Sequence, residues 1–290
     1  MKIKYKILTI ILFPVISIAN SISFQMENDS MFHSDNDYSN GIRINYNYNN
    51  LDTFIGQHIY TPSSIRNMEK DDRPYAGWSY FGLGYTDIGI KYNNLRYVGY
   101  YETLIGVVGK ASGSEWVQKK VHKIIGAGYP TGWESQIEDE FGFQLNTKQG
   151  FEYTMCTKKE YSAIVCPDLV VICGSTQDSI GFDTSFKFGY NIPISKTDSE
   201  FMVRSIKKDF SIYGILGTEF KYWKNNLFLD GNEDSKYKVN KKDYTCVVKT
   251  GICSSYKHIG IDFLILWGTK EYDTQKDMPN YASIKITYIF

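Results

Sequence analysis

Two side chains, Gln118 and His122, combine the residue types and the spacing of a hydrolytic site. Histidine is the commonest general base near neutral pH, because its unperturbed pKa of about 6.5 lies close by. Residues four apart on a helix share one face, so the Gln118 amide can hydrogen-bond the His122 ring and orient it. The other histidines, His33, His58 and His258, have no such preset partner. Taken alone, the pair equally describes an ordinary surface helix.

Three further polar clusters lie earlier in the chain. They are Glu27 to Asp29, Asp37 to Gly41, and Lys70 to Tyr75. Each cluster alone has the composition of a turn, since Asn, Asp, Ser and Gly favour turns for backbone reasons. Ester hydrolysis needs a nucleophile, a base and groups that stabilise an oxyanion. The clusters would supply these residue types together if the fold brought them to one place.

The sequence segments that must position these clusters have the residue pattern of strands in a membrane β-barrel. The segment 282–290 alternates, with Ile284, Ile286, Tyr288 and Phe290 on one face. Ending on an aromatic residue resembles the terminal signal of outer-membrane barrels. Eleven more segments show strand patterns: 21–29, 39–48, 52–60, 76–87, 95–107, 141–155, 160–174, 178–191, 209–223, 243–255 and 257–270. We therefore expect an all-β fold, a 12-stranded antiparallel transmembrane β-barrel with a short helix in an extracellular loop.

Composition supports a barrel. Beyond the leader, no stretch approaches the roughly 20 apolar residues of a membrane helix, so a spanning chain must close its strands. Aromatic residues make up 16% of the chain, led by 24 tyrosines, which fits the interfacial girdles of barrels. Removing three leader lysines from 32 basic residues leaves 29 against 32 acidic residues. This balance gives no reason to expect a nucleic-acid partner.

Residues 1–19 predict a signal peptide. Three lysines within the first six residues precede an apolar run at 7–18 that is too short to span a bilayer. Ser17 and Ala19 give the small-x-small pattern for cleavage before Asn20. The alternative is an uncleaved N-terminal anchor helix, but Pro14 would interrupt such a helix. We expect residues 20–290 to form one barrel domain, a monomer in the outer membrane of a Gram-negative bacterium.

An even strand number places both termini on the periplasmic side. The polar clusters and the Gln118–His122 pair then collect on the outer rim. The outer connections are 30–38, 61–75, 108–140, 224–242 and 271–280, and most are long. The periplasmic turns are short, except for the connection at 192–208.

The connection 108–140 predicts a short amphipathic helix. Ser112 and Glu115 form an S-x-x-E capping box, and Gly126 with Gly128 ends the helix. We expect it to lie against the barrel with three distinct stripes. These are Val117, Val121, Ile124 and Ile125; then Glu115, Gln118 and His122; then Trp116, Lys119 and Lys123.

The five cysteines are odd in number and include no C-x-x-C pair, which argues against a zinc cluster. They are Cys156, Cys166, Cys173, Cys246 and Cys253. Disulfides are possible in the periplasm. Most of these residues lie in apolar strand patterns, so we expect small buried hydrophobes.

The segments that carry the polar clusters resemble the outer-membrane lipid A 3′-O-deacylase family. The matching stretches are FQMENDSMF…DNDYSNGIRINY, DRPYAGW and GVVGKASGSEWVQKKVHKIIG…GW, in order from Phe24 to Glu140. VQKKVHKIIG together with END…YSNG is specific, whereas neither piece is specific alone. The resemblance implies a 12-stranded barrel with its site between the wall and the outer leaflet. It implies hydrolysis of the ester-linked 3′-acyl chains of lipid A with Ca²⁺.

The resemblance also implies roles for individual residues. Asn28 and Asp29 would lie at the metal and oxyanion site, with Ser39 beside them. Lys70 would contact the substrate. His122 would be the base and Gln118 its orienter.

One position departs from the family. A glutamate that helps hold the metal in some members corresponds to Gly128 here. Either Ca²⁺ has fewer protein ligands in this chain, or Glu134, Glu138 or Glu140 substitutes.

The residues themselves support a coherent reaction. His122 would take a proton from water, and an oxygen-bound Ca²⁺ would polarise the ester. Lys70, Arg73 and Lys123 could meet the phosphates of lipopolysaccharide. A serine-type lipid hydrolase that uses Ser39 is one alternative, although no G-x-S-x-G motif supports it. A non-catalytic structural barrel or narrow channel is the other.

Overall fold

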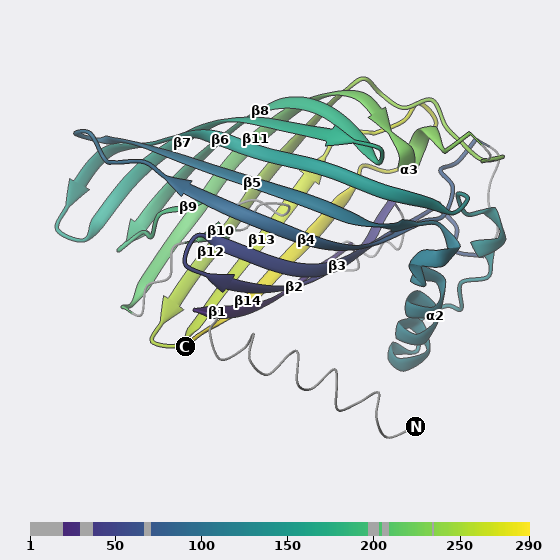
Figure 1. Cartoon of the computed structure of the whole chain (residues 1–290), viewed down its shortest axis with the longest axis horizontal. Helices are drawn as coiled ribbons and strands as arrows, with labels where there is room; N and C mark the ends of the chain where they lie inside the picture. Colours follow the sequence, from purple (N-terminus) through teal and green to yellow (C-terminus); the bar gives the residue numbers. More distant parts are fainter. Residues whose placement is uncertain (1–19, 30–36, 67–70, 197–202, 205–208, 234) are drawn as a thin grey trace.

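Alternation of apolar and polar residues folds this chain into a closed antiparallel β-barrel, seen in a computed structural model (Figure 1). The structure describes residues 20–29, 37–66, 71–196, 203–204, 209–233 and 235–290. The predicted signal peptide at 1–19 and Lys70 lie outside these ranges. The barrel strands in the described part are β1 (Ser21–Asn28), β2 (Asp37–Tyr48), β3 (Leu51–Thr61), β4 (Ala76–Ile88), β5 (Leu95–Val108), β6 (Glu140–Lys158), β7 (Tyr161–Gly174), β8 (Gln177–Tyr190), β11 (Ser211–Asn226), β12 (Tyr244–Tyr256), β13 (Ile259–Gly268) and β14 (Asn280–Ile289).

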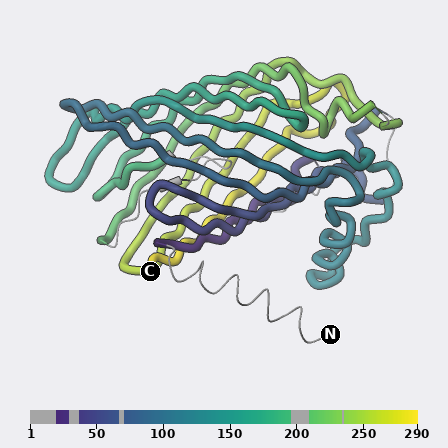
Figure 2. Tube along the Cα trace, in the orientation of Figure 1, coloured from purple at the N-terminus to yellow at the C-terminus, as the bar shows by residue number. Residues whose placement is uncertain are grey.

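The prediction of twelve antiparallel strands is confirmed. The first and last strands pair in register from Ser21 with Ile289 to Asn28 with Ala282, which closes the barrel and leaves no free edge. The Phe290 amide donates to the Asn20 carbonyl at 3.0 Å, so the C-terminus lies where β1 begins (Figure 2). Within the described residues, no helix is long and apolar enough to cross a membrane.

The outward face of the barrel is apolar. Large hydrophobic side chains are exposed along successive strands, as a lipid environment requires. They include Phe24, Met26, Ile55, Phe81, Leu83, Ile105, Phe143, Leu145, Leu169, Phe182, Leu216 and Ile252. All five cysteines lie in the described part and form no disulfide there. Cys166 and Cys253 are buried as expected, but Cys156 and Cys173 are exposed.

The inward face is charged and its charges are paired. Lys148 and Lys249 both contact the Asp183 carboxylate, the second at 2.6 Å. Arg43 pairs with Glu102 at 3.0 Å. Pairing is necessary because an isolated buried charge is costly. These paired side chains lie in the middle of the lumen.

Short elements close both ends of the lumen. At the outer end, helix α3 (Leu227–Asp230) buries Phe228, whose ring stacks on Tyr60 at 4.6 Å. At the periplasmic end, strand β9 (Ser195–Lys196) pairs with β10 (Val203–Arg204). Ser195 is buried there, because the Lys187 ammonium donates to its carbonyl at 2.5 Å. The sequence offered no explanation for the long 192–208 connection; its described residue Ser195 contacts Lys187 and Glu152 inside the barrel.

Candidate active site between helix α2 and the barrel wall

The helix expected at 108–140 is α2 (Ser114–Ile125), which lies beside the outer end of the barrel (Figure 1). It ends at Gly126 as predicted, with φ 72° and an N–H that donates to the His122 carbonyl. The predicted capping box is wrong. The N-cap is Gly113, with φ 70° and no side-chain cap. Ser112 belongs to a preceding turn, where its hydroxyl donates to the Gly109 carbonyl at 2.6 Å.

The buried face of α2 is polar. Ser114, Gln118 and His122 are 1%, 4% and 5% exposed, whereas Ile124 and Ile125 are 82% and 68% exposed. The helix thus lies against the barrel as expected. Val117, at the start of its apolar stripe, packs against the wall, whereas Ile124 and Ile125 at the end of the stripe are exposed. That stripe continues the apolar outer surface of the barrel.

Gly77 explains how the polar face comes so close to the wall. A Cβ atom at this position of β4 would overlap the side chains of Ser114 and Ser112. The Gly109 N–H also donates to the Gly77 carbonyl at 3.0 Å. Gln57 of β3 adds a bond from its amide to the Ser112 carbonyl at 3.1 Å. The start of α2 is therefore fixed directly on the backbone of the barrel.

A backbone carbonyl orients His122. The Nδ1 atom lies 2.5 Å from the carbonyl oxygen of Gly128. A carbonyl only accepts, so Nδ1 carries the proton and Nε2 keeps its lone pair in the neutral ring. This tautomer is the one that a general base working through Nε2 requires.

Gln118 does not orient His122, so that prediction is wrong. Its Oε1 atom accepts a hydrogen bond from Trp133 Nε1 at 2.7 Å. Trp133, in the short helix η3 (Gly132–Ser135), is itself held against Tyr75 with ring centroids 4.6 Å apart. Among the described residues, the buried Gln118 Nε2 has no partner. The amide therefore presents a fixed, unused donor.

A polar row crosses the outer ends of β1, β2 and β3. Asn28 Nδ2 donates to the Ser39 carbonyl at 2.8 Å. Ser39 is the extra residue of a β-bulge, where the register shifts between Tyr38 and Asn40, and its hydroxyl contacts that of Thr61. Bulges re-aim side chains and are common beside active sites. Thr61 was not predicted, since a strand-end threonine carries no functional signal of its own.

The row and the helix meet on one outward surface. Ile59 and Thr61 point to the same side of β3, because side chains alternate along a strand. Trp133 and Val117 pack on Ile59. The polar row, through Thr61, therefore lies on the same outward side of β3 as the cluster against which α2 packs. Asp29 follows β1 and is buried.

Arg73 is placed elsewhere. It is 1% exposed, and its guanidinium pairs with Glu271 at 3.1 Å and Asp37 at 3.6 Å. It also lies over the Tyr60 ring at 4.8 Å, at the outer mouth of the lumen. Burial lowers the pKa of Arg73, but the carboxylates of Glu271 and Asp37 raise it by more, so the pKa is raised overall. Arg73 therefore holds the rim together and does not face lipid, contrary to its predicted role as a substrate contact.

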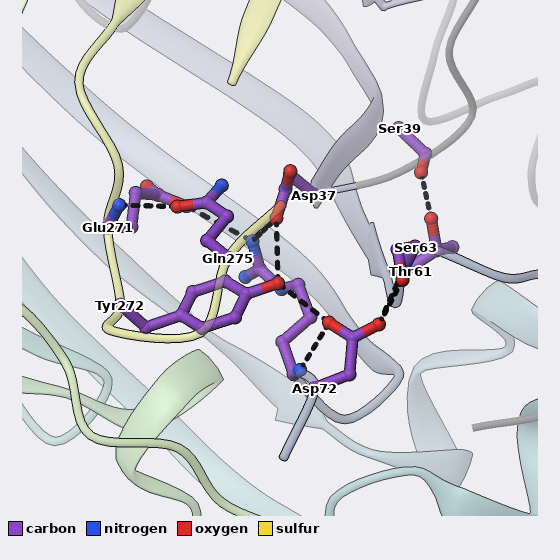
Figure 3. A network of polar contacts seen from close by, with 9 residues as sticks. Asp37, Ser39, Thr61, Ser63, Asp72, Glu271, Tyr272 and Gln275 are labelled. Atoms are coloured by element: carbon purple, nitrogen blue, oxygen red, sulfur yellow. Dashed lines mark hydrogen bonds and ion pairs between the residues drawn. The ribbon is translucent and has the colours of Figure 1, made fainter. Parts of the chain in front are cut away.

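The same mouth carries a second buried acid. Burial alone would raise the pKa of Asp72, but hydrogen bonds from Ser63 and Tyr272 lower it overall. Burial, with Asp37 nearby, raises the pKa of Tyr272 well above its ordinary value. The hydroxyl of Tyr272 thus stays protonated and donates (Figure 3).

The described residues contain no group of three or more His, Cys, Asp or Glu placed to hold a metal. Glu134, Glu138 and Glu140 therefore do not form such a cluster with Asp29. The expected ligands Asn28 and Asp29 are neighbours in the chain, and their amide and carboxylate oxygens suit Ca²⁺ by type.

Fold and site together define an outer-membrane β-barrel protein with a polar site on its lipid-facing wall. The family described as outer membrane protein LpxR matches residues 7–290, so the chain belongs to the LpxR family. The solved structure of LpxR from Salmonella typhimurium is similar with a TM-score of 0.83 and 21% identity, covering 93% of this chain and 100% of that one.

Other solved barrels are less similar. The KdgM porin has a TM-score of 0.41 and 9% identity, covering 93% of this chain and 99% of that one. The β domain of the Bordetella autotransporter BrkA has a TM-score of 0.45 and 9% identity, covering 94% and 100%. Neither likeness is strong enough to carry a conclusion. No curated protein matches the sequence significantly.

Proposed function

We propose that this chain is an outer-membrane ester hydrolase that removes the ester-linked 3′-acyl chains of lipid A. The observation that carries the proposal is His122, buried against the outward wall of the barrel with Nδ1 on the Gly128 carbonyl. A base on this face meets lipid, whereas a base in the lumen would meet water. Family membership supports the same class of substrate.

The proposed reaction uses water as the nucleophile. His122 Nε2 takes a proton from water while the hydroxide oxygen bonds to the acyl carbon. The tetrahedral oxyanion needs donors placed in advance, and Gln118 Nε2 would be such a donor, with Asn28 and Ser39 as further proposed contributors. When the intermediate collapses, the proton passes to the departing sugar oxygen. The products are a fatty acid and a free hydroxyl on lipid A.

We further propose that the site binds Ca²⁺. Asp29 and Asn28 would hold the ion through their side-chain oxygens. When bound, Ca²⁺ would supply Lewis-acid polarisation of the ester carbonyl. It normally takes about six to eight oxygen ligands, so backbone carbonyls, water or substrate phosphate would complete the shell.

The exposed side of α2 suits the outer leaflet. Its apolar stripe, with Ile124 and Ile125, would insert among acyl chains, and Lys123 would meet phosphates near the headgroups. Lys70, outside the described residues, remains a proposed substrate contact on the strength of the resemblance alone. The activity needs one chain, and we expect a monomer.

The two alternatives have less support. A serine nucleophile must hydrogen-bond its base, but the Ser39 hydroxyl contacts Thr61 and has no hydrogen bond to His122. A channel needs an open lumen, but α3 and β9 lie at its two ends and paired charges lie between them.

The test is mass spectrometry of lipid A from cells that express the chain, its His122→Ala variant or its His258→Ala variant. His258 is a matched control, because its Nδ1 lies 2.6 Å from the Ile289 carbonyl at the periplasmic end. We expect loss of the 3′-linked acyl group with the wild type and His258→Ala only. Normal cleavage by folded His122→Ala would sink the assignment.

A further inference from the structure

A loop distant in sequence from the site closes over the strands that carry Ser39. It is the β13–β14 connection at 269–279, and it brings Tyr272 to the start of β2 (Figure 3). The buried Tyr272 hydroxyl lies 2.7 Å from Asp72 Oδ1 and 3.4 Å from Asp37 Oδ1. One hydroxyl therefore bridges the carboxylate at the start of β2 and a carboxylate of the β3–β4 connection.

Each carboxylate supports one side of the Ser39–Thr61 hydroxyl pair. Asp37 lies two residues before Ser39 and is the strand partner of Thr61. Its φ of 58° is left-handed, a conformation that needs support from its surroundings. On the other side, Asp72 accepts hydrogen bonds from the Ser63 N–H at 2.8 Å and hydroxyl at 2.5 Å. Ser63 lies two residues beyond Thr61.

The bulge makes this support necessary. An extra residue interrupts the ladder between β2 and β3 where Ser39 sits, so strand pairing alone does not fix its place. Tyr272, with the carboxylates of Asp37 and Asp72, supports the two strands on the extracellular side of this bulge. Figure 3 shows the contacts of Tyr272 with Asp37 and Asp72, and those of Asp72 with Ser63.

The loop that carries Tyr272 is itself anchored from two sides. The Lys242 N–H donates to the Glu271 carbonyl at 2.6 Å, and the Asp273 N–H donates to the Asn240 carbonyl at 3.1 Å. On the opposite side, the Thr274 hydroxyl contacts the Asp71 carbonyl. Tyr272 is thus held between the 227–243 connection and the β3–β4 connection.

We infer that Tyr272 is a positioning residue of the proposed active site, acting through Asp37 and Asp72 on the Ser39 and Thr61 hydroxyls. The inference rests on the proposed function and adds a residue that neither the motifs nor the polar clusters indicated. Tyr272 does not contact the substrate. It sets the geometry of the wall on which the ester is held.

The kinetic test compares Tyr272→Phe with Tyr100→Phe in the full-length protein. Both rings are buried, and the Tyr100 hydroxyl accepts from Arg43 at 3.1 Å deep in the lumen. We expect Tyr272→Phe to lower kcat about tenfold with KM within about twofold, because misplaced groups cost rate more than binding. Tyr100→Phe should leave both unchanged. In a Ser39→Ala background, Tyr272→Phe should have no further effect; a full tenfold loss there would overturn the inference.

A second measurement does not depend on activity. Backbone hydrogen exchange of residues 38–41 should accelerate in Tyr272→Phe and stay at the wild-type rate in Tyr100→Phe. Unchanged exchange would overturn the inference, whatever the kinetics. Accelerated exchange in a protein that never deacylates lipid A would support the positioning role and refute the proposed function instead.

Discussion

Gly77 is the contact point between α2 and the barrel, so Gly77→Ala tests whether the docked helix makes the site. The new methyl group would overlap Ser114 and Ser112 at the first turn of the helix. Gly77 lies on the outward side of β4, because Trp78 and Tyr80 on the same strand pack inside. The substitution therefore leaves the lumen untouched and displaces the helix that carries His122.

The expected size follows from the overlap. Overpacking by one methyl group typically costs about 1–3 kcal/mol, and the helix can relieve it by moving outward. A displacement of about 1 Å at a catalytic group can lower the rate about 100-fold. That factor corresponds to about 2.7 kcal/mol of lost transition-state stabilisation. We therefore expect kcat/KM to fall about 100-fold while the barrel remains folded.

The assay is lipid A deacylation by purified protein, with barrel folding checked by resistance to denaturant on gels. Gly214→Ala is the matched control, because its added Cβ would meet atoms no closer than 3.9 Å. Ser114→Gly should restore part of the rate lost in Gly77→Ala, since it removes the side chain that the methyl group meets. Wild-type activity in Gly77→Ala would refute the argument that this close contact positions His122.

Two further predictions concern the metal and the membrane. Excess divalent-cation chelator should reduce deacylation to background, and added Ca²⁺ should restore it; full turnover in chelator would remove the ion from the mechanism. Ile124→Ser combined with Ile125→Ser should lower the rate on lipid A in vesicles by a factor of ten or more, because full burial of even one isoleucine contributes about 1.5–3 kcal/mol and about 1.4 kcal/mol is a factor of ten. The rate on lipid A in detergent should stay within about twofold, and equal losses in both would exclude an insertion role.

Most of the fold was predictable because its signal is local. Outward and inward residues alternate along each strand, and this alternation places nearly every strand within two or three residues of its observed bounds. The early start of β2 at Asp37 was missed, since a left-handed aspartate followed by a bulge breaks the pattern. The inward position of Ser195 was missed as well, because its contacts are with lumen residues Lys187 and Glu152 of other strands.

For the candidate site, the sequence predicted which residues could do chemistry but not which groups hold them in place. His122, Asn28 and Ser39 stand out by residue type and motif. The groups that hold them do not, because a backbone carbonyl such as that of Gly128 has no side-chain signal and Thr61 and Trp133 are common residues. Arg73 was assigned to substrate from its charge alone, although its charge is used by Asp37 and Glu271.

The sequence by itself determined a twelve-stranded outer-membrane barrel, the end that carries the polar clusters and the residue suited to be the base. These properties follow from the alternation of apolar and polar residues along each strand and from residue types. Both signals can be read from short stretches of the sequence. The tertiary structure alone decided which face of α2 meets the wall, which groups orient His122 and Gln118, and how Tyr272 supports Ser39. Those contacts join segments far apart in sequence, and only closure of the barrel brings them within reach.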